Sequence, residues 1–291
     1  MMLLLVTLGW GVSYYMMDLC LEEMDPMTLN AYRFLGAFAV AFILAFPKVR
    51  NVNRITLKYA FIVSITLVFV YLFATYGVKY TSQSNAGFFC ATSAVITPIM
   101  AFFVKKVVPD RKLIFVIILC MTGMALMSLD EQFHIALGDV LCAMCGLSYA
   151  VMLLVNESGV AHEKVDAFQL GVYQLGFTGV WMVPLSILFG QPVLPHSTGC
   201  WISVIFLAVF CTGMAFICQA IAQQYTSATH VGIIFTLEPV FASIVAFFFA
   251  GERLLPRAYV GAGMMLLSLL IMEIDIGKLL KRGTGNNTTD E

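Results

Sequence analysis

The sequence predicts an all-α polytopic membrane protein with ten transmembrane helices in two inverted five-helix repeats, and three observations lead to this prediction. Of the 291 residues, 60% are hydrophobic and 11% are charged, whereas a soluble domain carries about 45–50% apolar and about 25% charged residues. The charged residues gather in short clusters between long uncharged stretches. In addition, an internal repeat divides the chain into two similar halves.

Ten apolar stretches are expected to be the membrane helices, because an α-helix needs about 20 residues to cross a hydrocarbon core of about 30 Å. In the first half they cover residues 1–20, 27–46, 57–78, 82–104 and 112–129. In the second half they cover residues 138–156, 166–189, 198–220, 227–250 and 256–275. The first stretch is interpreted as a mature helix rather than a signal peptide, since no basic residue precedes it. The connections are short, so any function is expected inside the bundle.

The distribution of lysine and arginine predicts the orientation in the membrane. With the amino terminus in the cytoplasm, the basic clusters at 48–58, 105–112 and 278–282 lie on the cytoplasmic side. Far fewer basic residues then fall outside, among them Lys79 and Arg253. We therefore expect a multi-pass protein of the cell membrane with both termini in the cytoplasm.

An internal repeat relates the two halves of the chain. The polar sequence Tyr80-Thr81-Ser82 returns as Tyr225-Thr226-Ser227, and the register continues without a gap, so that Gly87 aligns with Gly232. Five helices in each half give the two copies opposite orientations, as in many secondary transporters. The expected units are residues 1–129 and residues 138–275, followed by a cytoplasmic polar tail at 276–291. A duplicated membrane protein without transport activity remains an alternative explanation of the repeat.

Several motifs resemble those of a known transporter family. In the second half, Leu237-Glu238-Pro239-Val240 is followed by Gly251-Glu252-Arg253-Leu254, and in the first half Trp10-Gly11 is followed by Tyr32-Arg33-Phe34. This pattern resembles the EamA-type transporters of the drug/metabolite transporter superfamily over nearly the whole chain. The resemblance implies ten helices, two inverted units of five, and export or facilitated passage of amino acids, other metabolites or drugs. The first half departs from the pattern at residues 105–108, where Lys-Lys-Val-Val replaces Gly-Glu-Arg-Leu.

Glu238 is the acidic residue with the clearest functional potential. It lies near the middle of an expected membrane helix, where ionisable groups usually face a cavity or a partner. The next residue, Pro239, has no amide hydrogen and so permits a kink that can open the helix to polar groups. The alternative is a neutral Glu238 that fixes helix packing through a hydrogen bond.

Polar and aromatic side chains recur at three- and four-residue steps on single faces of several expected helices, and such faces should turn toward the bundle interior. Together they predict a substrate cavity that combines aromatic rings with amide and hydroxyl groups, although interhelical packing also explains each stripe by itself. The expected cavity residues are Trp10, Ser13, Tyr14, Ser93, Tyr149, Gln219, Gln223 and Glu238. Pro98 and Pro239 are the expected kink or gating positions.

Arg33 is a candidate charge anchor. It can pair with a carboxylate or contact the substrate, but its expected place near the outer interface also fits a side chain that extends toward the lipid headgroups.

These features predict a secondary transporter, either an exporter or a facilitator, that moves amino acids or related amphipathic solutes by alternating access. The expected partners are a small amino-acid-like metabolite and the lipid bilayer, with protons as a further candidate. The formal net charge of -1 and the lack of a basic stripe argue against nucleic acid. We expect no catalytic residue, metal or cofactor, because the four histidines are scattered. The alternatives are a structural or sensory membrane protein without translocation and a membrane-embedded enzyme.

Overall fold

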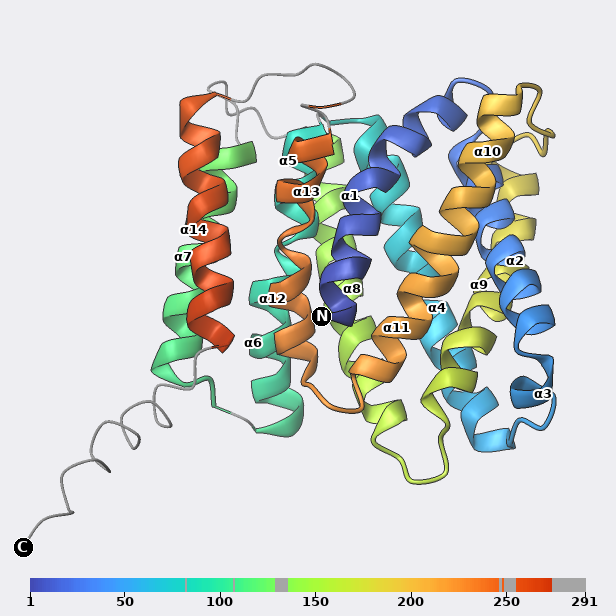
Figure 1. Ribbon diagram of the computed structural model, residues 1–291, viewed down its shortest axis with the longest axis horizontal. Helices are drawn as coiled ribbons and strands as arrows, with labels where there is room; N and C mark the ends of the chain where they lie inside the picture. Colours follow the sequence, from blue (N-terminus) through green and yellow to red (C-terminus); the bar gives the residue numbers. More distant parts are fainter. Residues whose placement is uncertain (82, 107, 129–135, 246–247, 249–254, 274–291) are drawn as a thin grey trace, which may run out of the picture.

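The structure is a computed structural model that describes residues 1–81, 83–106, 108–128, 136–245, 248 and 255–273. Over these residues the chain is all-helical and contains no β-strand, so the all-α prediction is confirmed for the described part. The long helices stand side by side as a bundle (Figure 1). Seven of the described helices are long and apolar enough to cross a membrane, whereas the expected total of ten remains a prediction.

The helices of the first half begin and end close to the expected positions. Pro26 opens the second helix, where its missing amide hydrogen costs nothing, and the side chain of Asn53 accepts a hydrogen bond from the Thr56 amide at the start of the fourth. The bounds are α1 Met2–Leu21, α2 Pro26–Leu44, α3 Phe46–Val49, α4 Arg54–Lys79, α5 Gln83–Cys90, α6 Ser93–Lys105 and α7 Arg111–Ser128.

Three helices of the second half begin at polar caps. Asp166, Ser197 and Ser227 each accept a hydrogen bond from the backbone amide three residues later. The bounds are α8 Leu137–Val160, α9 Ala167–Phe189, α10 Thr198–Phe206, the π-helix η1 Leu207–Met214, α11 Ala215–Ala222, α12 Ala228–Phe235, α13 Glu238–Val245 and α14 Pro256–Glu273. The expected helix at 198–220 is therefore one rod with a π-helical middle, and the expected helix at 227–250 is divided. Part of the latter lies outside the described residues.

Close packing at glycines ties the helices together. A Cβ atom added to Gly138 of α8 would lie 2.5 Å from the carbonyl oxygen of Gly77 in α4. A Cβ atom added to Gly123 of α7 would lie 2.6 Å from the carbonyl oxygen of Gly261 in α14. Small residues allow the backbones to approach closely. In a membrane, where lipid is as apolar as the helix surface, the van der Waals packing gained in this way favours helix association.

Two helices are broken at equivalent positions of the sequence repeat. The expected single helix at 82–104 divides into α5 and α6, and its counterpart divides into α12 and α13. In the register that aligns Tyr80 with Tyr225, α5 and α12 share both their first and their last positions. The two broken helices lie next to each other in opposite directions, with α12 against α6 and α13 against α5 (Figure 1).

Candidate functional site

A pocket with a cavity volume of about 150 Å³ lies inside the bundle, where the two broken helices are interrupted. Side chains from α1, α2, α4, α8 and α11 complete its wall. A cavity of about this size holds a molecule of benzene size. The pocket therefore suits a compact solute, and we call it the central pocket.

Equivalent residues of the repeat line this pocket together. Gly87 of α5 and Gly232 of α12 both line it, and so do Ser93 of α6 and Glu238 of α13. In each pair the second residue occupies the position in the repeat that the first occupies in its own half. The central pocket is thus built from the two broken helices together, and neither half contains it alone.

Four aromatic rings form one wall of the central pocket. The Trp10 ring has its centroid 4.6 Å from that of Phe235, 5.8 Å from that of Phe216 and 6.2 Å from that of Tyr149. Rings at these separations attract each other beyond the burial of their area. The Trp10 Nε1 atom also donates a hydrogen bond of 2.8 Å to the carbonyl oxygen of Cys211 in η1. The wall is therefore fixed at both the rings and the indole nitrogen.

Arg33 lies in the wall of the central pocket. Its side chain is 2% exposed. The Nε atom donates to Thr212 Oγ1 at 3.1 Å, an Nη atom contacts the Met17 sulfur at 3.3 Å, and the guanidinium lies 5.3 Å from the centre of the Tyr71 ring. These contacts hold the side chain inside the bundle.

Gln219 and Gln223 of the expected cavity set do not line the central pocket but extend from it. The Tyr149 hydroxyl donates to Gln219 Oε1 at 3.0 Å, and Gln219 Nε2 donates to Gln223 Oε1 at 3.3 Å. Gln223 in turn accepts a hydrogen bond from Asn156 and donates to the carbonyl oxygen of Leu153 at 2.9 Å. A continuous polar chain thus joins the pocket wall to the lower part of the bundle.

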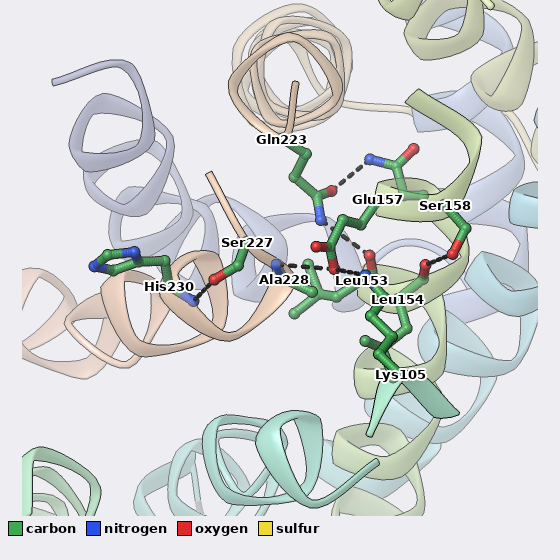
Figure 2. A network of polar contacts seen from close by, with 10 residues as sticks. Lys105, Leu153, Leu154, Glu157, Ser158, Gln223, Ser227, Ala228 and His230 are labelled. Carbon is green, nitrogen blue, oxygen red and sulfur yellow. Dashed lines mark hydrogen bonds and ion pairs between the residues drawn. The ribbon is translucent and has the colours of Figure 1, made fainter. Parts of the chain in front are cut away.

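An ion pair closes the bundle at the lower end in Figure 1. Lys105 Nζ, at the end of α6, lies 2.8 Å from Glu157 Oε2 near the end of α8. The same oxygen accepts a hydrogen bond of 3.2 Å from the Ala228 amide at the start of α12 (Figure 2). We call these three groups the lower clasp. Sequence analysis did not predict this contact.

The other residues expected in the site do not all line the central pocket. Ser13 is buried, lines the central pocket, and donates to the Trp10 carbonyl oxygen at 2.7 Å. Pro239 also lines the pocket, directly after the helix break. Pro98 lies inside an uninterrupted α6 and lines a different pocket, beside the lower clasp. The side chain of Tyr14 lies outside the described residues.

Two loops at the upper end of the bundle are joined by a carboxylate. Glu23, between α1 and α2, accepts hydrogen bonds from the His196 amide at 2.8 Å and the Ser197 amide at 3.1 Å. Hydrogen bonding, first from the Ser197 side chain and then from these amides, lowers the pKa of Glu23 below its ordinary value. The charged form therefore holds the loop before α10 against the loop after α1.

The apolar helices define a multi-pass membrane protein that encloses an internal pocket. The chain belongs to the EamA-like transporter family, whose model matches residues 1–129 and 136–274. The family resemblance drawn from the motifs is thus confirmed.

Individual relatives agree with this assignment. An uncharacterized transporter of Archaeoglobus fulgidus is 28% identical over 94% of this chain and 85% of its own length. The uncharacterized transporter YetK of Bacillus subtilis is 25% identical over 81% of this chain and 74% of its own length. A solved crystal structure matches with a TM-score of 0.79 at 16% identity and covers 98% of both chains, which shows the shared fold.

Proposed function

We propose that this protein is a secondary transporter of the cell membrane, an exporter or facilitator, that carries amino acids or related compact amphipathic solutes by alternating access. One observation carries the proposal: repeat-related residues of two broken, oppositely directed helices line a single pocket. Secondary transporters commonly bind their substrate at midplane between inverted repeats, where discontinuous helices meet. The proposal includes ten helices, two five-helix units and cytoplasmic termini.

The chemistry of the central pocket supports a solute of amino-acid type. Trp10 and its neighbouring rings offer an apolar wall, whereas Arg33 and Glu238 bring a basic and an acidic residue to the same cavity. A solute with an apolar body and charged groups at one end matches this combination. Glu238 is also the candidate proton carrier, since intramembrane acidic residues frequently serve this role.

The lower clasp supports alternating access. Lys105, Glu157 and the Ala228 amide join three helices at one end of the bundle, the end proposed to face the cytoplasm. Opening the central pocket toward that end requires these groups to separate. Because the pair is partly exposed to solvent, water can replace its contacts at a modest cost. The clasp can therefore separate without a large energetic cost.

Reconstitution into proteoliposomes tests the proposal. A mixture of labelled amino acids should move across the membrane in the presence of the protein, with a rate that depends on the solute gradient. The assay is repeated with and without a pH gradient to detect proton coupling. Protein-free liposomes are the control, and a Lys58→Met variant, altered at an exposed residue outside the pocket, should match the wild type. Lack of flux for all amino acids under every gradient would contradict the proposal.

A further inference from the structure

Arg33 is a buried cation whose contacts in the described part of the chain are uncharged. Its partners there are the Thr212 hydroxyl, the Met17 sulfur and the Tyr71 ring. Lys105 and Glu157 form an ion pair, and Arg33 forms none within the described part of the chain. Glu238 lines the same pocket. A charge in this environment is costly unless a counter-charge is supplied.

The helical segment that contacts Arg33 has an unusual backbone geometry. Thr212, which holds the Arg33 Nε atom, belongs to the π-helix η1, and the neighbouring Cys211 carbonyl oxygen accepts the hydrogen bond from Trp10. A π-helix is rare and frequently occurs at functional sites. The π-helix thus orients two residues of the central pocket at once.

Arg33 has N–H donors available to bind a ligand in the pocket. A guanidinium has five N–H donors, and of its three nitrogens Nε and one Nη are held by Thr212 and Met17. The second Nη nitrogen donates to no residue in the described part of the chain, while the side chain lines the cavity. A guanidinium fixed at Nε therefore presents the N–H donors of its second Nη nitrogen for a charge-assisted hydrogen bond to a carboxylate.

We propose that Arg33 binds the acidic group of the transported solute, so that the pocket selects compact molecules with a carboxylate beside an apolar or aromatic body. The solute then provides the counter-charge that the described protein residues do not. The aromatic wall around Trp10 receives the apolar body. This assignment rests on the proposed function, in which the central pocket is the transport site.

Thermal unfolding of the purified full-length protein in detergent tests this assignment with three probes that share one ring: benzoate, benzyl alcohol and benzylamine. Benzoate should raise the Tm more than either uncharged or cationic probe. Arg33→Met should weaken benzoate binding about 10- to 100-fold, the range expected for a lost charged hydrogen-bonded contact, and leave benzyl alcohol binding unchanged. Lys58→Met removes an exposed cation outside the pocket and should retain the wild-type preference.

Two further variants keep the test decisive where Arg33→Met fails to fold. Arg33→Lys retains the charge and should preserve part of the benzoate preference. Thr212→Val removes the acceptor that orients the guanidinium and should reduce the preference without altering the charge.

Equal Tm shifts for benzoate and benzyl alcohol, no shift with any probe, or an unchanged benzoate preference in the arginine and threonine variants would overturn the assignment. The proposed function fails separately. A benzoate preference without amino-acid flux in proteoliposomes leaves the anion site intact and contradicts transport, whereas flux that treats acids and amines alike supports transport and contradicts the anion site.

Discussion

Ser93 and Glu238 occupy the same position of the repeat, each as the first residue after the break in its helix, and both line the central pocket. The two halves thus place different chemistry at one structural position, a hydroxyl in one and a carboxyl in the other. A symmetric origin of the fold does not require a symmetric site. The acidic member of the pair is therefore the place to look for coupling to protons.

Replacing Glu238 with glutamine should reduce amino-acid flux about tenfold or more and abolish the response to a pH gradient, because the amide cannot carry a proton. The measurement is uptake into proteoliposomes at matched protein content. The control is Ser93→Ala, which alters the equivalent position and should retain the pH response. Unchanged rates and an unchanged pH response in Glu238→Gln would remove this residue from the mechanism.

Breaking the lower clasp should expose the central pocket from the lower end. Glu157→Gln removes the ion pair with Lys105. Such a partly exposed pair contributes about 0.5–1 kcal/mol. An impermeant thiol reagent applied at the lower end should therefore label the pocket residue Cys145 about two- to fivefold faster in this variant. The experiment requires a variant in which the other seven of the eight cysteines are replaced.

Charge reversal provides the control for the clasp. The double variant Lys105→Glu with Glu157→Lys can restore the pair, and its labelling rate should return toward that of the wild type. Equal labelling of Cys145 in all three proteins would show that the pair does not restrain the pocket.

Gly138→Ala should destabilise the protein by about 1–3 kcal/mol, the usual cost of overpacking a tight interior. The added methyl group would lie 2.5 Å from the Gly77 carbonyl oxygen, so the backbones of α4 and α8 must separate. The measurement is the Tm in detergent. Gly263→Ala is the matched control, because its Cβ atom would meet no atom within 4 Å, and its Tm should be equal or slightly higher. A similar fall in both variants would argue against close packing as the cause.

Acidification should release the loop at the upper end of the bundle. Because hydrogen bonds lower the pKa of Glu23 in the folded state, its contribution to stability is complete above the unfolded pKa, near 4.5, and is lost as the pH falls through the lower folded pKa. Hydrogen exchange of the His196 and Ser197 amides should therefore accelerate, relative to the intrinsic rate, only at pH below about 4.5.

Glu23→Gln separates this effect from general acid unfolding. In that variant the two amides should be less protected at neutral pH and should lose the acid-dependent step. The matched control Glu22→Gln, at an adjacent exposed residue, should follow the wild type. A wild-type profile in Glu23→Gln would assign the protection to other contacts.

The sequence predicted helices well and interruptions poorly. The expected stretch at 57–78 corresponds to α4 at Arg54–Lys79, because hydropathy reports burial in lipid directly. The expected helix at 82–104, however, is broken before Ser93 and not at Pro98. No proline or glycine marks that break. Thr92 lies there against α8, where a Cβ atom on Gly146 would be 2.5 Å from the threonine hydroxyl, so tertiary packing decides the position.

The site was predicted in part for similar reasons. Periodicity correctly indicated that Gln219 and Gln223 are buried, but it could not show whether a buried stripe faces a cavity or another helix. The role of Thr212 depends on the π-helix, which has no compositional signal. Lys105 and Glu157 lie far apart in the sequence, and charge counting had assigned the lysine only to the membrane orientation. Repeat alignment was the most informative signal, since it paired Gly87 with Gly232, and both residues line the central pocket.

The breaks between α5 and α6 and between α12 and α13 also bear on the cost of motion. At both breaks the α-helical hydrogen bonds give way to shorter bonds between residues three apart, such as Thr92 to Phe89 and Leu237 to Ile234, so a pivot there disturbs fewer α-helical turns than one inside a regular helix. Movement of these helical segments would then be resisted mainly by contacts with neighbouring helices, such as the lower clasp and the close helix contacts at Gly138 and Gly123. Two hinges at matching depth would let the protein change shape while every helical segment stays intact.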